Sequence, residues 1–333
     1  MKPNIMPVSL GNYPTPIIKL ERLSKELGKS IYVKRDDYSG IELSGNKTRK
    51  LEYSLGEAIS KGADTIITCG AVQSNHARAT VSACRVLGLD VHLVLRTKDG
   101  KEPEEKEGNN LLDYIFGAKI TYLSEEEFKN YNEVMENIKN SYLSEGKNPY
   151  LIPVGASNGV GTLGYFNGYE EILNQEKNLN ISFDSIVCTI GSGGTFAGLW
   201  LGNEIHNELK NIIGISISEG SDYFKEKVQN ILKETSIYFD IDFKDILKKS
   251  ESSLDIVGGY QGGGYAISTK EERDFIEEIA LKEGIIFDPV YTGKAFRGLV
   301  SEIKNGGFQD SENILFIHTG GIFGSFSYHK SDS

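Results

Sequence analysis

The stretch Ser44-Gly45-Asn46-Lys47-Thr48-Arg49-Lys50, continued as SGNKTRKLEY over residues 44–53, decides how this chain is interpreted. A Ser-Gly-Asn turn runs directly into a helical pattern, in which Leu51, Leu55 and Ala58 recur on one face. Lys47 should therefore lie in the first turn of a helix over 47–59, where a cation is electrostatically misplaced. On spacing alone it is a surface lysine after an N-cap. The alternative is an amine nucleophile toward a carbonyl, whose pKa the positive helix end lowers.

Working outward, short apolar runs alternate with helical patterns through most of the chain. Runs rich in Ile, Val or Leu, as buried parallel strands are, cover 63–69, 91–95, 119–123, 150–154, 185–190, 212–217 and 314–318. Helical patterns follow at 76–87, 125–143, 195–205 and 294–303. This alternation predicts an α/β fold of mostly parallel, twisted sheets flanked by helices. We interpret the charged, weakly periodic segment 236–253 as a surface excursion.

Size and charge narrow the possible functions. The chain has 333 residues, more than one core usually supports, so we expect two domains. Its 36 basic and 47 acidic residues give a net charge of −11, which argues against a nucleic-acid partner. A bound phosphate would need local backbone amides, because the global field repels it. No apolar run approaches the roughly 18 residues of a membrane span, and residues 1–10 lack the apolar core of a signal peptide.

The cysteines stand at positions 69, 84 and 188, far apart in the sequence. This spacing fits neither a disulfide framework nor a metal site, so we expect no metal. We interpret all three as small buried hydrophobes in a cytoplasmic protein.

A glycine-rich stretch, Gly191-Ser192-Gly193-Gly194-Thr195, lies between an apolar run and a helical pattern. Glycines let backbone amides converge on a phosphate, and the helix dipole assists. No Gly-Lys-Ser/Thr follows, which excludes a Walker loop, and Phe196 stands where a dinucleotide site needs its third glycine. We predict a site for a single phosphomonoester, since a plain tight turn would explain one glycine but hardly three.

Polar and aromatic residues stand where other predicted elements meet. Gln73-Ser74-Asn75-His76 follows the run 63–69, the loop 258–265 is rich in glycine, 288–294 opens a helix, and His318-Thr319-Gly320-Gly321 closes the last run. The carboxyl ends of parallel strands share one edge, where α/β sheets bind ligands. We therefore expect these segments to lie on the same face.

Each of these residues also has a simpler interpretation. Helix capping alone would explain Ser74 or Asn75. His76 alone is more often a structural histidine, and Tyr265 and Tyr291 are more often packed aromatics. No partner is visible that would complete a Ser/His/Asp triad.

Taken together, the segments resemble the D-cysteine desulfhydrase and 1-aminocyclopropane-1-carboxylate (ACC) deaminase family of fold-type-II, tryptophan synthase β-like pyridoxal 5'-phosphate (PLP) enzymes. The resemblance is carried, in the family's order, by SGNKTRKLEY at 44–53, QSNHAR at 73–78, GSGGTFAGL at 191–199, GGGYAI at 262–267, DPVYTGKA at 288–295 and HTGG at 318–321. It implies a homodimer of two-domain subunits. In each subunit a small domain, 48–160, sits inside a large PLP-binding domain made of 1–47 and 161–333.

The resemblance also implies which residues hold the cofactor. Lys47 would carry PLP as a Schiff base and move the α-proton. Asn75 resembles the partner of the phenolic oxygen and Thr319 that of the pyridine nitrogen, where a hydroxyl favours elimination over transamination. The remaining cofactor residues resemble a phosphate cradle: Lys50, Gly191, Ser192, Gly193, Gly194 and Thr195.

A second set of residues is implied for the small amino-acid substrate. Ser74 corresponds to the deaminase nucleophile or proton carrier, and Tyr265 and Tyr291 to the substrate-side tyrosines, so these three join Lys47 as catalytic candidates. Asn75 and His76, with the same three, are candidates for binding the substrate.

Two positions divide the family. ACC deaminases resemble DPVYEGK, with Glu after the second Tyr, and commonly have Leu before the paired glycines, whereas this chain has Thr292 and Thr319. We therefore expect α,β-elimination from D-cysteine to pyruvate, hydrogen sulfide and ammonia. ACC deamination, an L-cysteine or cysteate lyase, a cysteine-synthase-like β-replacement and a PLP-binding protein without turnover stay open. The ending Gly320-Gly321-Ile322-Phe323-Gly324 lacks the proline of many relatives and leaves the substrate open.

Overall fold

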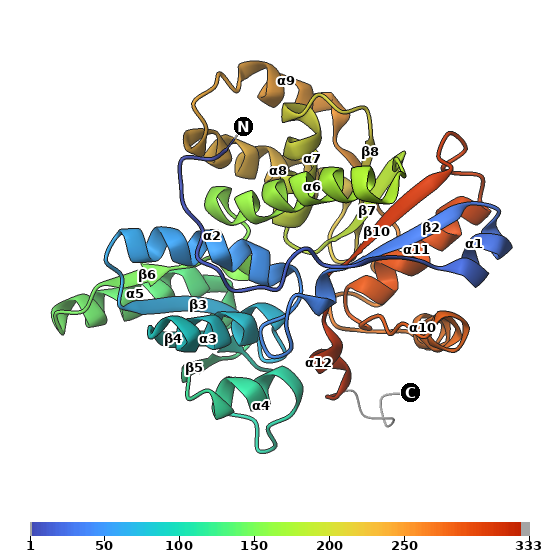
Figure 1. The fold of residues 1–333 in the computed structure, drawn as a ribbon. Helices are drawn as coiled ribbons and strands as arrows, with labels where there is room; N and C mark the ends of the chain where they lie inside the picture. The colour runs from blue at the N-terminus through green and yellow to red at the C-terminus, as the bar shows by residue number, and fades with distance from the viewer. Residues whose placement is uncertain (1, 328–333) are drawn as a thin grey trace.

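The computed structural model describes residues 2–327, which form two sheets surrounded by helices (Figure 1). The larger sheet has the strand order β1-β2-β10-β7-β8-β9, and every neighbouring pair is parallel except β1 with β2. The smaller sheet has the order β5-β4-β3-β6 and is parallel throughout. The strands are β1 (Ile17–Lys19), β2 (Ser30–Arg35), β3 (Thr65–Ala71), β4 (Asp90–Arg96), β5 (Lys119–Leu123), β6 (Pro149–Leu151), β7 (Ser185–Ile190), β8 (Asn211–Ser216), β9 (Asp255–Val257) and β10 (Asn313–His318).

Helices cover both sheets. They are α1 (Glu21–Leu27), α2 (Asn46–Ser60), α3 (Asn75–Leu87), α4 (Gly108–Ile115), α5 (Tyr131–Ser144), α6 (Gly159–Leu179), α7 (Gly194–Ile205), α8 (Ser221–Thr235), α9 (Lys244–Ser253), α10 (Lys270–Glu283), α11 (Thr292–Lys304) and α12 (Ile322–Ser325). Within residues 2–327, none of them is long and apolar enough to cross a membrane. The predicted α/β fold of parallel sheets flanked by helices is confirmed.

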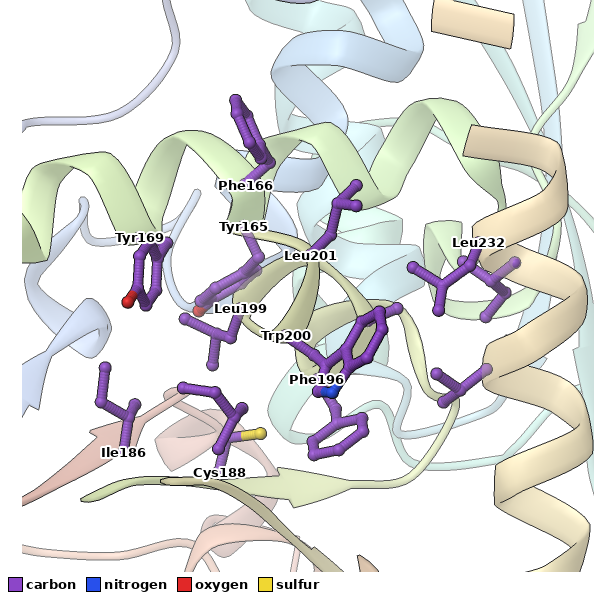
Figure 2. Packing of buried hydrophobic residues seen from close by; sticks show 14 of the residues in the cluster. Tyr165, Phe166, Tyr169, Ile186, Cys188, Phe196, Leu199, Trp200, Leu201 and Leu232 are labelled. Atoms are coloured by element: carbon purple, nitrogen blue, oxygen red, sulfur yellow. The ribbon is translucent and has the colours of Figure 1, made fainter. Parts of the chain in front are cut away.

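The larger sheet buries both of its faces. Along β10, Leu315 and Ile317 pack into the core formed with α6, α7 and α8, whereas Ile314 and Phe316 pack on the opposite side with α1, α10 and α11. Figure 2 shows the first of these cores, where Trp200 of α7 lies among neighbouring apolar side chains. Two buried faces explain why the strands are continuous apolar runs.

The smaller sheet is covered in the same way. Leu93 of β4 packs with α2 and α3, and Val94 packs with α5 on the other face. The three cysteines are free and buried, as the interpretation of them as small hydrophobes requires.

All seven predicted strands are present, but within residues 2–327 three others were missed: β1, β2 and β9. β2 was missed because Lys34 and Arg35 interrupt its apolar pattern. Lys34 is nevertheless 1% exposed, because its Nζ pairs with Glu171 at 2.5 Å. The predicted limits of the small domain, 48–160, stay a prediction, and the four-stranded sheet lies inside them.

The segment 236–253 is not a surface excursion along its whole length. It contains a short 3-10 turn and α9, and Phe239 and Phe243 are buried in the core beside α6 and α7. The sequence did not predict this burial, because many charged residues surround the two phenylalanines.

A buried ionic network joins β2 to α2. The Asp36 carboxylate is fully buried and accepts hydrogen bonds from Arg49 Nε and Nη2, both at 2.9 Å, and from the Tyr165 hydroxyl at 2.6 Å. Burial alone would raise the pKa of Asp36, but the cations of Arg49 and Lys34 and these hydrogen bonds hold it well below its usual range. The network fixes the start of α2 against the end of β2.

Replacing Arg49 should strongly destabilise the fold. The substitution Arg49→Met leaves the Asp36 carboxylate buried without its main partner, which costs about 3–5 kcal/mol of unfolding free energy. Urea unfolding measures this loss. The matched control, Lys270→Met, removes an exposed pair with Asp274 and should cost less than about 1 kcal/mol. Equal effects of the two substitutions would contradict the assignment.

Candidate functional site

Helix α2 begins on the carboxyl end of β10. Gly45, just before it, has φ 86°, and a Cβ there would lie 2.5 Å from the Thr319 carbonyl oxygen. The Asn46 amide donates to the same oxygen at 3.1 Å. Only glycine allows this approach. The predicted position of Lys47 in the first turn of a helix is confirmed.

Lys47 is held by its neighbour. Its Nζ donates to Asn46 Oδ1 at 3.1 Å, and Asn46 Nδ2 donates to Thr195 Oγ1 at 3.0 Å. Burial, reinforced by the Arg78 cation, lowers the pKa of Lys47 to about 8. The sequence predicted that the positive end of the helix lowers this pKa, but burial is the larger cause. A useful fraction of the Lys47 amine is therefore uncharged near neutral pH.

Lys47 lies in the wall of a cavity of about 310 Å³, between the carboxyl ends of strands from both sheets. Ala71 of β3 and Thr189 of β7 mark these ends in the cavity wall. Most of the predicted site residues line the cavity: Lys47, Ser74, Asn75, His76, Gly191, Ser192, Gly193, Thr195, Tyr265, Tyr291 and Thr319. The expectation that the motifs share a face is therefore met. Lys50 and Gly194 are the predicted site residues that do not line the cavity.

Each glycine of the loop 191–194 is needed for its own reason, either a backbone angle or a close contact. Gly193 has φ 93°, a Cβ on Gly191 would lie 3.0 Å from the Tyr291 ring, and one on Gly194 would lie 2.8 Å from Lys50 Nζ. The first amides of α7 have no intrahelical partner, as at any helix start. The loop therefore presents backbone donors and a positive helix end to the cavity.

Lys50 supports this loop from behind. Its Nζ donates to the Gly155 carbonyl and to Ser157 Oγ, both at 2.6 Å, and Ser157 Oγ lies 2.6 Å from Ser192 Oγ. Lys50 Nζ thus lies beside the loop and is connected to Ser192 through Ser157, and its predicted part in the phosphate cradle stays a prediction.

The start of α3 forms the opposite wall. Ser74 caps the helix, because its Oγ accepts from the Ala77 amide at 3.1 Å. Asn75 Oδ1 accepts from Asn109 Nδ2 at 2.9 Å, which leaves the Asn75 NH₂ group free of protein partners within residues 2–327. Ser74 thus both caps the helix and lines the cavity, which Asn75 lines as well.

His76 is a buried, neutral side chain. Its Nε2 lies 2.8 Å from Thr68 Oγ1, and the Thr68 hydroxyl donates to the Ile152 carbonyl, so Nε2 carries the hydrogen. Burial holds the pKa of His76 well below its usual value. Its Nδ1 is buried without a hydrogen-bond partner among the described residues.

Two tyrosines meet at the cavity. The hydroxyls of Tyr265 and Tyr291 lie 2.6 Å apart, and burial raises the pKa of both. Thr292, which divides the family, is fully buried and outside the cavity lining. Its hydroxyl donates to Asp288 Oδ1 at 2.6 Å. The hydroxyl thus holds the turn that carries Tyr291 and does not contact the phenol.

The polar groups that face the cavity fit PLP. The loop amides suit a phosphate, the Lys47 amine suits an aldehyde, and the Asn75 NH₂ group suits a phenolic oxygen. The Thr189 hydroxyl is buried in the cavity wall without a partner among residues 2–327, as expected where a polar ligand belongs.

Sequence reasoning missed several residues of this site. Asn46 adjoins Lys47 in the motif itself, and Glu219 follows β8 as the other site residues follow their strands, so both were accessible to the same logic. Arg96, at the end of β4, places its guanidinium 5.7 Å from the Phe128 ring and 5.8 Å from the Tyr265 ring. Asn109 has no motif that would have revealed it.

Comparisons with known proteins agree with this geometry. A model of the family described as "Pyridoxal-phosphate dependent enzyme" matches residues 8–320. A Thermotoga maritima protein, provisionally named a 1-aminocyclopropane-1-carboxylate deaminase, is 44% identical over 98% of this chain and 99% of its own length. The bifunctional D-cysteine desulfhydrase/1-aminocyclopropane-1-carboxylate deaminase of Arabidopsis thaliana mitochondria is 41% identical over 96% of this chain and 79% of its own.

A solved structure extends the agreement to the fold. The crystal structure of an ACC deaminase homologue is 43% identical and superposes with a TM-score of 0.87, covering 98% of this chain and 95% of the other. Since the family model and the two relatives each cover nearly all of the described chain, the protein belongs to the pyridoxal-phosphate dependent enzymes and is a lyase of the ACC deaminase and D-cysteine desulfhydrase group.

Proposed function

We propose that the protein converts D-cysteine and water to pyruvate, ammonia and hydrogen sulfide by α,β-elimination. The observation that carries this choice is the environment of Tyr291. The side chain that follows it, Thr292, is uncharged and bonded to Asp288, so it supplies no carboxylate to strengthen proton transfer. A sulfide leaving group needs little acid help, whereas opening the ring of ACC needs a strong proton relay.

The glycine loop and its support would hold the phosphate of PLP. Ser192, Thr195 and the first amides of α7 would be its donors, because the two side chains line the cavity beside the start of α7. Lys50 acts on the loop through Ser157. Thr319 would meet the pyridine nitrogen and Asn75 the phenolic oxygen. When bound, PLP supplies an electron sink for the α-carbon of an amino acid.

Lys47 would move the α-proton. Its amine is neutral in a useful fraction near pH 8 and can accept a proton directly. Asn46 bonds both Lys47 and Thr195, so it ties the base to the phosphate loop. This connection keeps the amine at a fixed distance from whatever the loop holds.

The tyrosine pair would face the β-substituent. Both phenols are neutral near pH 7, since burial raises the pKa of each. A neutral phenol donates a hydrogen bond to a departing sulfur but deprotonates little. Ser74, whose Oγ already accepts from Ala77, keeps its own hydrogen to donate toward the substrate.

ACC deamination is the second candidate, because the names of the Thermotoga and Arabidopsis relatives include it.

We also propose that two copies pair, as the family resemblance implies. Exposed apolar side chains on α4, on α12 and directly after α12 support this: Leu111, Tyr114, Ile115, Ile322 and Phe326. The unpaired buried cysteines agree with a reducing cytoplasm, which is part of the same proposal.

Cofactor capture should follow the titration of Lys47. The nucleophile is the neutral amine, so the rate at which PLP-free protein gains a visible band, near about 410–420 nm for a protonated Lys–PLP Schiff base, should rise with pH. We expect a midpoint near the Lys47 pKa of about 8, below the 10.5 of an ordinary lysine. Lys47→Ala should form no band that survives dialysis. A wild type that binds no PLP would refute the proposal at its base.

Gly193→Val should weaken PLP binding through the backbone. A Cβ there would meet Ile231 and Val228 at 3.3 and 3.5 Å, on the side of α8. The expected harm is thus strain at φ 93°, about 1–3 kcal/mol, and not a side chain blocking the phosphate. Fluorescence titration with PLP should show a Kd about 5- to 150-fold higher. Gly220→Ala, at an ordinary φ of −69° with open space around it, is the control and should leave Kd unchanged.

Substrate choice tests the assignment directly. D-Cysteine should yield sulfide and pyruvate, while ACC should yield little α-ketobutyrate. Thr292→Glu should not rescue ACC turnover, because a second carboxylate would be buried against Asp288 and should destabilise the fold by several kcal/mol. Thr292→Ser keeps the hydroxyl and should retain both stability and sulfide release. Efficient ACC turnover without sulfide from either cysteine enantiomer would overturn the choice of substrate and leave the enzyme class intact.

A further inference from the structure

We infer that Asn109, on α4 and remote from every sequence motif, is a positioning residue that determines which end of the Asn75 amide faces the cofactor. The inference rests on the proposed partnership of Asn75 with the phenolic oxygen of PLP. Asn109 is itself fully buried and does not line the cavity.

The orientation of the Asn109 amide is fixed at both ends. Its Nδ2 donates to the Gln73 backbone carbonyl at 3.0 Å, and its Oδ1 accepts from Arg78 Nε at 3.2 Å. A carbonyl can only accept and a guanidinium can only donate, so the reversed amide would lose both bonds. The Asn109 backbone amide is fixed as well, because it donates to Gln73 Oε1 at 2.9 Å.

This fixed polarity passes to Asn75. Asn109 Nδ2 has a second hydrogen, which it donates to Asn75 Oδ1 at 2.9 Å. Asn75 must therefore turn its oxygen toward Asn109, and its NH₂ group is left for the cavity that Asn75 lines. A donor at that point stabilises a phenolate oxygen, whereas a reversed Asn75 would present a carbonyl and repel it. Arg78, Asn109 and Asn75 thus form a chain of hydrogen bonds in which each group fixes the orientation of the next. Through this chain Arg78 determines that Asn75 presents a donor to the cofactor.

The test is Asn109→Asp, which changes one atom of this chain of hydrogen bonds. The new carboxylate still accepts from Arg78, but it places an oxygen against Asn75 Oδ1 in place of the NH₂ group. Asn75 should turn over and present its carbonyl to the phenolic oxygen, which favours the protonated phenol. In the purified PLP-loaded protein without substrate, absorbance should move from the visible to the near-ultraviolet band. We expect the band ratio to change about tenfold, or the pH midpoint between the bands to move by about one unit.

The matched control is Asn110→Asp, on the same helix. Asn110 is 1% exposed, and its amide touches none of Gln73, Asn75 or Arg78. Asn110→Asp introduces a similar buried carboxylate and should keep the wild-type spectrum. A spectral shift equal to that of Asn109→Asp would overturn the inference.

Asn109→Ala is the second variant, for use if thermal melting shows that Asn109→Asp does not fold. It frees Asn75 to adopt both orientations and should give an intermediate ratio. A wild-type spectrum and pH midpoint in the folded Asn109 variant, with PLP bound, would overturn the inference while leaving the proposed function intact. A wild-type protein without the visible band would instead refute the proposed function.

Discussion

The buried pair of Asp36 and Arg49 is the interaction on which the rest of the site depends. Arg49 stands two residues after Lys47 in α2, and Asp36 directly follows β2 of the larger sheet. Their two hydrogen bonds tie a helix that packs on the smaller sheet to a strand of the larger one. Because the cavity lies between carboxyl ends of both sheets, the position of Lys47 relative to the glycine loop is fixed through this pair.

Local charge opposes the charge of the whole chain. The net charge is −11, yet the cavity wall carries Lys47, Arg96 and Lys227 against Glu219 alone within residues 2–327. An anionic cofactor and an amino-acid carboxylate thus meet a cationic cavity on an acidic protein. Focusing by the low-dielectric walls makes the local charges dominate at short range.

The sequence predicted those parts of the site that depend on strand ends. Ser74, Asn75, the glycine loop and Thr319 could be predicted because parallel strands end at one edge and each of these motifs follows such an end, whereas Tyr291 follows no strand and was indicated only by the family resemblance. The sequence could not predict roles that depend on the direction of a side chain or on packing between elements distant in the sequence. Lys50 bonds Ser157, Thr292 bonds Asp288, and Asn109 bonds Arg78 and Asn75.

The strand order of the larger sheet has a consequence for how the protein is made. β10, the last strand within residues 2–327, lies between β2 and β7, and the carbonyl oxygen of the residue after it, Thr319, accepts from the Asn46 amide. During synthesis the amino-terminal strands have no place in the sheet until nearly the whole chain has emerged, whereas the smaller sheet is contiguous in sequence and can assemble first. The turn that carries Lys47 is therefore completed only once β10 is in place.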